Sequence, residues 1–393
     1  MRTLAVVGLF ASLVAAAHAE SPAERGRYLA AVGDCVACHT VPGGTPFAGG
    51  RAIETPFGPI IAPNLTPDRA SGLGTWSDAD FLGAMKRGVR PDGARLYPAC
   101  PYVYFSTVRD EDLLAIRAFL ATLAPVANPA RGTEFGFPFN LRPLMVFWDA
   151  LYFRPTPFMP DPSRSAEWNR GAYLVAGLGH CGACHGAKGA LGANRAPGAL
   201  DGGRVRGWFA PDLGGDPRAG LGGWSLDDIE RYLATGSNGR ALAAGPMAEV
   251  VENSTARMTA ADLRAIALYL KQDAPLSPPG RGPSAAPNDN LGAAIYADAC
   301  AACHRASGEG VPGLFPRLAG SAVVQSARPD TLITVVLHGS RAAATNAAPT
   351  GPAMPGLGWR LDDASAAAVL TYIRSAWGNE AAPVSGDAVR RGR

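Results

Sequence analysis

The residues best suited to chemistry in this 393-residue chain are cysteines and histidines that recur in one pattern. Six of the seven cysteines lie in three copies of Cys-x-x-Cys-His, at Cys35–His39, Cys181–His185 and Cys300–His304. Two thiols at this spacing can add to the vinyl groups of a porphyrin, and the adjacent imidazole can bind its iron. The pattern therefore predicts three covalently attached c-type haems. The predicted attachment residues are Cys35, Cys38, Cys181, Cys184, Cys300 and Cys303, and the predicted iron ligands are His39, His185 and His304.

Two other uses of such cysteines fit the pattern less well. A structural zinc site needs four ligands, and each pentapeptide would need a second Cys or His pair nearby. A redox dithiol of the thioredoxin type needs no histidine after its second cysteine, and it rarely occurs three times in one chain. Covalent haem attachment accounts for the histidine and for the repetition.

The N-terminus predicts export. The first 19 residues have an arginine at position 2, an uncharged apolar run and a small-x-small end at Ala17-His18-Ala19, which is typical of a cleaved secretory signal. Bacterial c-type haem is attached outside the cytoplasmic membrane, so the two predictions support each other. No later segment has the ~18–20 uncharged apolar residues that a spanning helix needs. We expect a periplasmic protein, or one associated peripherally with the membrane, and the formal charge of +3 indicates no nucleic-acid partner.

Three similar segments lead into the pentapeptides and indicate an internal repeat. They are RGRYLAAVGDCVACH from Arg25, RGAYLVAGLGHCGACH from Arg170 and LGAAIYADACAACH from Leu291. Each predicts a short helix with a glycine near its start and a tyrosine on the haem side. We expect a mainly α fold of three tandem cytochrome c-type units, in which short helices and loops wrap around the haems. The predicted divisions are 1–19 signal peptide, 20–126 unit 1, 127–165 connecting segment, 166–273 unit 2, 274–288 Pro/Gly-rich linker, 289–380 unit 3 and 381–393 polar tail.

Capping residues and apolar spacing predict further helices. Ser77 and Ser225, each followed by aspartates, precede apolar periodicity and mark helix starts. Each unit ends in a segment with apolar residues at i, i+3, i+4 and i+7, namely residues 110–123, 259–272 and 361–377. Such a stripe predicts a closing helix that packs against the N-terminal helix of the same unit.

The connecting segment is unusually apolar and aromatic. Its middle part reads FPFNLRPLMVFWDALYFRPTPFMPDP. One interpretation is a segment that packs across units 1 and 2. The other is an exposed patch that faces a partner or a quinone.

The group on the far side of each iron decides whether a haem is closed or open to ligands. The mature chain has only two spare histidines, His180 and His338, so methionine must serve for most of the haems. Met247, in AAGPMAEVV, and Met354, in GPAMPGLGW, are predicted on loops held by Gly and Pro, from which a thioether can reach an iron. His338 could rival Met354, but it fits a helix residue near a haem edge.

Cys100, in YPACPY, is the one cysteine outside the pentapeptides. Trp224 precedes Met247 by 23 residues and Trp76 precedes Cys100 by 24, so the repeat aligns the cysteine with the methionine. Three interpretations follow: Cys100 binds the first iron as a thiolate, it lies beside the iron without bonding, or Met85 takes the position. A thiolate ligand would favour ferric iron and lower the potential. We expect Cys100 within contact distance of the first iron.

Five longer stretches carry a resemblance to a known family. They are NLTPDRASGLGTWSDADF, GVRPDGARLYPACPY, PDPSRSAEWNRGAYLVAGLGHCGACH, AAGPMAEVVENST and GPAMPGLGWRLDDASAAAVLTYIRSAWGN. The whole mature chain resembles the triheme cytochrome c subunit of bacterial membrane-associated dehydrogenases for alcohol, gluconate, sorbitol, fructose and, with molybdenum, aldehydes or N-heterocycles. The resemblance implies Met247 and Met354 as sixth ligands, whereas family members commonly carry methionine where Cys100 stands.

The resemblance also implies partners. A catalytic dehydrogenase subunit of the flavin, quinoprotein or molybdenum type would supply electrons. Ubiquinone, a terminal oxidase or a soluble cytochrome would accept them. Some relatives end in a membrane-binding tail, and this chain stops soon after Trp377.

Two classes of function are compatible with these residues. The first is an electron-transfer subunit without substrate chemistry of its own, which three haems without a flavin, pterin or nucleotide motif favour. The second is a haem enzyme that acts on a sulfur compound or a peroxide at the first haem, beside Cys100. A periplasmic shuttle without a stable partner is a third interpretation. The substrate belongs to the partner and is not encoded in this chain.

Overall fold

The computed structural model describes residues 20–129, 132–133, 135–196, 198–272 and 290–393. The predicted signal peptide (1–19) and the predicted linker (274–288) lie outside these residues. Short helices dominate the described chain, as predicted, and its strands form three two-stranded antiparallel sheets. Within the described ranges, no helix combines the length and apolarity needed to cross a bilayer.

Two helices of unit 1 begin with a capping box at a serine. Ser21 and Ser77 each accept a backbone N–H from the third residue of the helix, and the carboxylate of Glu24 or Asp80 accepts the N–H of the serine. The predicted helix start at Ser77 is confirmed. The elements are α1 (Pro22–Val32), α2 (Cys35–Cys38), β1 (Ala52–Ile53), β2 (Ile60–Ile61), α3 (Asp78–Arg87), α4 (Tyr102–Phe105) and α5 (Asp110–Leu120).

Unit 2 repeats this order after the connecting segment. Ser225 caps its helix with Asp228 in the same way as Ser77, so the second predicted start is also confirmed. The connecting segment holds η1 (Arg142–Leu144) and α6 (Met145–Tyr152). Unit 2 consists of α7 (Ala166–Ala176), α8 (Gly182–His185), β3 (Gly203–Val205), β4 (Trp208–Ala210), α9 (Leu226–Thr235), α10 (Pro246–Asn253), η2 (Thr255–Arg257) and α11 (Ala260–Gln272).

Unit 3 has the same first and last helices with a shorter middle. Its elements are α12 (Asn290–Ala299), α13 (Ala301–His304), α14 (Ala322–Gln325), α15 (Asp330–His338), β5 (Gly339–Arg341), β6 (Ala353–Pro355) and α16 (Asp363–Ser375). The tail forms α17 (Gly386–Arg390), which packs against α16.

In every unit the first helix crosses the closing helix at a glycine. The pairs are α1 with α5, α7 with α11 and α12 with α16. A Cβ at Gly26 would lie 1.8 Å from the Ala115 carbonyl oxygen, and one at Gly171 would lie 2.0 Å from that of Ala265. At Gly292 the corresponding distance is 2.4 Å. Only a residue without a side chain permits this backbone approach, which explains the repeated glycine and confirms the predicted helix pairing.

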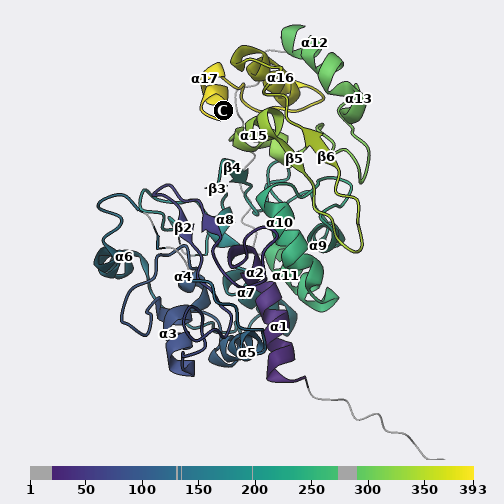
Figure 1. Ribbon diagram of the computed structural model, residues 1–393. Coiled ribbons are helices and arrows are strands. Elements are labelled where there is room, and N and C mark those ends of the chain that lie inside the picture. Colours follow the sequence, from purple (N-terminus) through teal and green to yellow (C-terminus); the bar gives the residue numbers. More distant parts are fainter. Residues whose placement is uncertain (1–19, 130–131, 134, 197, 273–289) are drawn as a thin grey trace, which may run out of the picture.

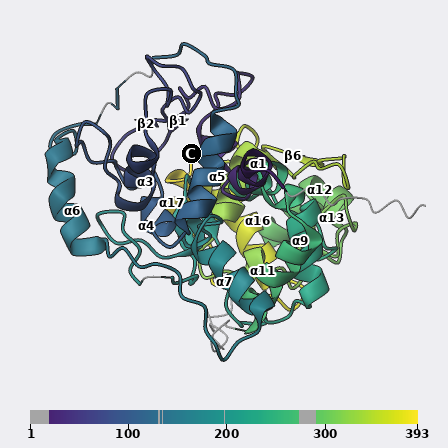
Figure 2. The ribbon, with the colours of Figure 1, turned by 90° about the horizontal axis from the view of Figure 1, so that it is seen from below.

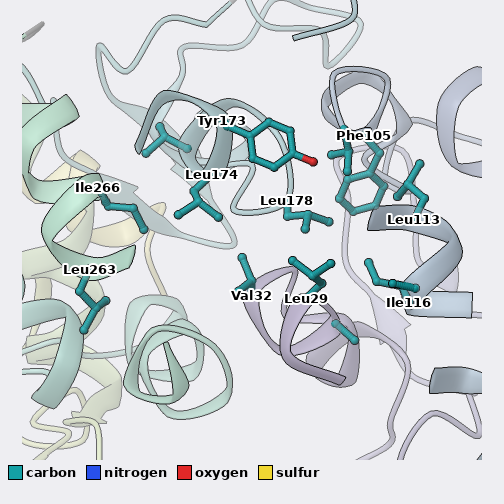
Figure 3. Packing of buried hydrophobic residues seen from close by; sticks show 14 of the residues in the cluster. Leu29, Val32, Phe105, Leu113, Ile116, Tyr173, Leu174, Leu178, Leu263 and Ile266 are labelled. Carbon is teal, nitrogen blue, oxygen red and sulfur yellow. The ribbon is translucent and has the colours of Figure 1, made fainter. Parts of the chain in front are cut away.

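Units 1 and 2 share one hydrophobic core. Leu29 and Val32 on α1 face Leu178, which follows α7, while Leu113 and Ile116 on α5 close the same cluster (Figure 3). Burying a side chain of this size stabilises a fold by about 1.5–3 kcal/mol. The two units are therefore held together by apolar burial as well as by the chain.

A reciprocal polar contact crosses the interface between units 1 and 2. Tyr173 of α7 donates its hydroxyl to Asp112 of α5 at 2.6 Å, and Tyr28 of α1 donates to Asp262 of α11 at 2.5 Å. Within each unit, Arg25 pairs with Asp112 and Arg170 pairs with Asp262. The two units are thus related by an approximate two-fold exchange of contacts. Tyr28 and Tyr173, which were predicted on the haem side, each donate their hydroxyl to a carboxylate of the neighbouring unit.

Burial and charge explain why this contact persists. Burial disfavours the charge on Asp112, but hydrogen bonds from Tyr173 and Arg25 outweigh it and hold the pKa of Asp112 below its ordinary value. Burial also opposes the charge on Asp262, whose pKa is nevertheless lowered by Arg170 and Tyr28. Burial and the neighbouring carboxylate raise the pKa of Tyr173 to about 12, so its hydroxyl remains a donor.

Unit 3 has its own core and meets unit 2 through hydrogen bonds and a small apolar cluster of Ala343 with Ala243, Ala248 and Val251. Its buried residues form a separate cluster around α12, α15 and α16. Ala343 donates its N–H to the Ala243 carbonyl at 2.9 Å, and Thr331 on α15 exchanges two hydrogen bonds with the Phe209 backbone at 2.9 and 3.0 Å. Figure 1 shows unit 3 above the paired units, and both views show α6 at their left edge.

Candidate haem-attachment sites

Each pentapeptide lies on a single helical turn that directly follows the first helix of its unit. Cys35 and Cys38 are the first and last residues of α2, and the corresponding turns in units 2 and 3 are α8 and α13. Residues three apart on a helix lie on one face, so each cysteine pair presents both thiols to the same side. All seven cysteines fall in the described ranges, and none forms a disulfide.

The three histidines make the same hydrogen bond. His39 Nδ1 lies 2.7 Å from the Pro63 carbonyl oxygen, and His185 Nδ1 lies 2.7 Å from that of Pro211. In unit 3, His304 Nδ1 lies 2.9 Å from the Pro316 carbonyl oxygen. A carbonyl can only accept, so Nδ1 carries the proton and Nε2 keeps its lone pair. This is the arrangement that orients an imidazole to bind a metal through Nε2.

The protonation states also suit iron binding. Burial lowers the pKa of all three imidazoles, partly offset by the proline carbonyls, so each ring favours the neutral form that a metal requires. Burial raises the pKa of Cys35 and Cys181 to about 12 and that of Cys300 to about 11. A redox dithiol needs a lowered thiol pKa, so the surroundings argue against that use.

The structure gives no support to a zinc site. Among the residues that it describes, it brings together no group of three or more His, Cys, Asp or Glu side chains that could hold a metal ion. Each turn offers two thiols and one imidazole with a fixed tautomer. This set fits an iron that arrives within a porphyrin, because the thiols can anchor the porphyrin and the imidazole can bind the iron, which would take its other ligands from the porphyrin and elsewhere.

The predicted sixth-ligand methionines lie in regular elements, and the prediction of loops was wrong for both. Met247 is the second residue of α10, directly after Pro246 and Gly245. Met354 is the central residue of β6 and pairs with Ser340 of β5. Gly245, which the sequence placed beside Met247, has a φ of +55°, and Gly339, which the sequence did not single out, has one of +77° at the start of β5. Both methionines are half-buried against the cores of their units.

Cys100 lies beside the first pentapeptide. It precedes α4 by two residues and is half-buried. Burial raises its pKa to about 12, and a charge on Cys38 would raise it further. A charge on Cys100 would in turn raise the pKa of Cys35. A charge on Cys100 would thus be felt electrostatically at Cys35, and one on Cys38 at Cys100, while Met85 lies in α3 against the shared core.

Neither spare histidine is placed as a simple ligand. His338 ends α15, as predicted for a helix residue, and its Nε2 lies 2.7 Å from the Gly392 carbonyl oxygen of the tail. His180 precedes Cys181 with a φ of +35°, and its ring lies 5.9 Å from the ring of Phe105 in unit 1. The contact between His180 and Phe105 is one of several between units 1 and 2 near the pentapeptides.

Each of the first two pentapeptides is covered by the other unit. Tyr104 of α4 accepts a hydrogen bond from Asn194 at 2.8 Å, and a Cβ at Gly182 would lie 3.3 Å from its ring. Conversely, Arg51 binds both the Ala37 carbonyl of α2 and the Glu249 carboxylate of α10. Sequence reasoning missed this exchange, because no motif marks a residue that contacts a different repeat.

A buried carboxylate and a shared cation lie where the two units meet. Asp34, with a φ of +49°, has a buried oxygen without a hydrogen-bond partner. Burial and the charge of Glu249 raise the pKa of Asp34 to about 8. Burial raises the thiol pKa at both Cys38 and Cys184, and the charge of Arg206 offsets part of that rise at each. One side chain is thus close to the first and second attachment sites.

Comparison with known proteins agrees with this geometry. The family model described as cytochrome c matches residues 23–124, 169–273 and 290–377. The chain belongs to the cytochrome c family. It is 41% identical over 400 residues to the cytochrome c subunit of the quinone alcohol dehydrogenase of Gluconacetobacter polyoxogenes, covering 95% of this chain and 85% of the relative.

Two further relatives are cytochrome subunits of dehydrogenases for other substrates. The gluconate 2-dehydrogenase cytochrome c subunit of Pantoea cypripedii is 39% identical over 402 residues, covering 95% of this chain and 89% of the relative. The fructose dehydrogenase cytochrome subunit of Gluconobacter japonicus is 36% identical over 408 residues, covering 96% of this chain and 84% of the relative. The resemblance found in the sequence to cytochrome c subunits of dehydrogenases is confirmed.

Proposed function

We propose that this chain is a triheme c-type cytochrome that transfers electrons for a dehydrogenase. The observation that carries the proposal is the threefold geometry of a cysteine pair and a histidine whose Nδ1 is bound to a proline carbonyl. Relatives that match nearly the whole chain are cytochrome c subunits of dehydrogenases. The haem-bearing units are residues 20–126, 166–273 and 289–380.

The chain's own residues hold and orient the groups that carry electrons. Bound haem supplies a one-electron ferric–ferrous couple at each site. The six motif cysteines anchor the porphyrins, and His39, His185 and His304 each present Nε2 to one face. When haem is bound, Met247 and Met354 would each supply the second protein ligand to the iron in units 2 and 3, and Cys100 would be the residue nearest that position in unit 1. An iron whose ligand positions are all taken by protein groups binds no substrate, which suits electron transfer.

The fold fixes the first two sites relative to each other. The shared core and the two tyrosine–aspartate contacts leave little freedom between units 1 and 2. The charge of Arg206 offsets part of the rise that burial causes in the thiol pKa at Cys38 in the first motif and at Cys184 in the second. Tyr104 of unit 1 contacts the second motif through its hydrogen bond with Asn194. With haem bound at both sites, electron transfer between them would need no domain movement. Unit 3 joins through the contact of α15 with β4, and its residues would hold the third group of the relay.

We also propose the location and partners. The mature protein acts on the periplasmic side of the membrane after removal of residues 1–19. A catalytic dehydrogenase subunit donates electrons, and ubiquinone or a terminal acceptor, such as an oxidase or a soluble cytochrome, receives them. The names of the relatives support the donor; they give no acceptor.

The decisive experiment has two parts. Mass spectrometry of the exported chain should show the added mass of three haems, and Cys→Ala pairs at each motif should remove one haem at a time. The purified holoprotein should then be reduced only when its dehydrogenase partner and that partner's substrate are both present. Reduction by the substrate alone, or a chain without bound haem, would refute the proposal.

Cys100 supports a second candidate, a haem enzyme acting on a sulfur compound or a peroxide at the first haem. The supporting observation is the electrostatic interaction of this half-buried thiol with Cys35 and Cys38. Turnover of thiosulfate or peroxide by the isolated holoprotein, lost in Cys100→Met, would establish it. The closed sites of units 2 and 3 favour electron transfer as the main function.

A further inference from the structure

The connecting segment exposes most of the large apolar side chains that the protein presents to solvent. Fourteen such side chains are exposed among the described residues, and nine of them lie between positions 137 and 159. We call these nine the α6 face. They are Phe137, Phe139, Leu141, Leu144, Val146, Phe147, Leu151, Tyr152 and Met159. Scattered exposed apolar residues are ordinary, whereas a concentration of this kind marks a binding surface.

Helix α6 has the reverse of the burial pattern of an ordinary surface helix, with its charged residue buried and its apolar residues exposed. Its one acidic residue, Asp149, is buried, whereas Phe147 and Leu151 are 68% and 67% exposed. Leu144, Phe147 and Leu151 recur at helical spacing and form a stripe opposite Asp149. A helix whose charged residue faces the protein and whose apolar stripe faces outward requires a nonpolar neighbour.

Specific contacts hold the helix in this orientation. Asp149 accepts hydrogen bonds from Tyr102 at 2.7 Å and from Arg95 at 2.8 Å. Trp148 donates its indole N–H to the Leu191 carbonyl of unit 2 at 2.9 Å. The segment therefore does pack against units 1 and 2, as one interpretation of the sequence had it, and it does so while leaving its apolar stripe outside.

The charges beside the α6 face favour an anionic neighbour. Between residues 135 and 160 the only acidic residue is Asp149, which is buried and paired, and the next, Asp161, accepts hydrogen bonds from Ser163. Arg154 is exposed, and its guanidinium donates to the Ala150 and Phe153 carbonyls, with no acidic partner among the described residues. Arg142 donates to the Arg95 carbonyl and lies over the Tyr97 ring. Apolar side chains bordered by uncompensated arginines complement an anionic lipid surface.

We propose that the α6 face docks this protein onto an anionic phospholipid bilayer. The helix, about 12 Å long at 1.5 Å per residue, lies in the interface and inserts Phe147 and Leu151 among the upper acyl chains. Arg142 and Arg154 meet the lipid phosphates. Figures 1 and 2 show α6 at the edge of the molecule remote from unit 3, so a membrane can reach it without contacting that unit. This deepens the proposed location on the periplasmic side of the membrane.

Sedimentation of the mature holoprotein with vesicles tests the proposal. It should sediment with vesicles of phosphatidylcholine and phosphatidylglycerol, and less with phosphatidylcholine alone. Phe147→Ser with Leu151→Ser should weaken binding about tenfold per side chain, or about a hundredfold. Arg154→Gln should weaken binding to the anionic vesicles about fivefold. Haem content, measured separately, should stay unchanged.

A matched pair of exposed apolar residues in unit 3 gives the control. Leu314→Ser with Trp359→Ser removes comparable surface, 45% and 85% exposed, and should bind vesicles like the wild type. Wild-type protein that stays in the supernatant with anionic vesicles, or equal losses in both pairs, would overturn the proposal. So would a Phe147/Leu151 variant that binds vesicles normally but no longer copurifies with a dehydrogenase subunit. Haem loading and partner-dependent reduction report on the proposed function independently.

Discussion

Replacing Tyr173 with phenylalanine should loosen units 1 and 2 from each other without disturbing unit 3. The hydroxyl donates to Asp112 at 2.6 Å and accepts the Arg109 backbone N–H at 3.1 Å. Phenylalanine keeps the ring, which packs edge-on against Phe158 with centroids 5.3 Å apart. The substitution therefore removes hydrogen bonds and leaves the apolar packing.

The expected magnitude follows from the burial of Asp112, which is 0% exposed. Hydrogen bonds to a charged group contribute about 1.5–3 kcal/mol to stability. Arg25 and Arg109 still pair with the carboxylate, so the loss should stay within that range. Tyr28→Phe should have a similar effect, because Tyr28 makes the reciprocal bond to Asp262 at 2.5 Å.

The assay is urea unfolding of the holoprotein, followed by hydrogen exchange of amides in separate helices. Amides of α1, α5, α7 and α11 should all lose protection together, because these helices share one core. Amides of α16 should keep theirs. Tyr372→Phe is the control: the described structure gives its hydroxyl no hydrogen bond, and its ring lies within the unit 3 cluster.

Two results would refute this reasoning. A stability change below about 0.5 kcal/mol, no larger than that of an ordinary surface substitution, would mean that the bond between Tyr173 and Asp112 contributes little. Loss of protection in α7 and α11 alone would mean that the two units unfold independently.

Four further outcomes are expected. Folding lowers the pKa of Asp112 and Asp262. The stability that these carboxylates contribute is therefore complete above the unfolded-state pKa of about 4 and is lost as pH falls through the folded-state pKa. The free energy of unfolding, measured against pH, should fall more steeply in acid for the wild type than for a variant with Asp112→Asn and Asp262→Asn. Gly26→Ala should destabilise the paired units by about 1–3 kcal/mol in urea unfolding, because its Cβ would meet the Ala115 carbonyl. Cys100→Met should raise one haem potential most in a redox titration, with a smaller change at the second haem through α4 and the third left in place; three unchanged potentials would exclude Cys100 from the first iron. Met354→Ala should let the reduced protein bind carbon monoxide at one haem, whereas a matching gain in His338→Gln would contradict the assignment of Met354.

Local features of the fold could be predicted because they depend on neighbours in sequence. The helix starts at Ser77 and Ser225 follow from side-chain caps that act within one turn. The closing helices follow from apolar spacing, and the crossing glycines recur with the repeat. Met247 and Met354 were predicted on loops, whereas they lie in α10 and β6. Proline at the first position of α10 starts a helix as readily as it ends a loop.

The contacts between units could not be predicted because nothing in a single repeat encodes them. Tyr173 reads as a haem-side aromatic until its partner, Asp112, is known to lie 61 positions earlier in the chain. The outward stripe of α6 was open to two interpretations, since periodicity gives the faces of a helix but not which face is buried. Only the contacts of Asp149 settle the direction.

The position of Cys100 has a consequence for two sites rather than one. Cys100 lies beside the first motif, while Tyr104, four positions later, contacts the second through Asn194 and Gly182. The short helix α4 therefore connects Cys100, the proposed sixth ligand of unit 1, with the turn that carries Cys181 and Cys184 in unit 2. If both haems are bound as proposed, a change at Cys100 that shifts α4 would also affect the second haem, and α10 gives unit 2 the reciprocal contact with α2. Because both connections pass between units 1 and 2, the potentials of their haems should respond together, while that of unit 3, which has a separate core, should respond less.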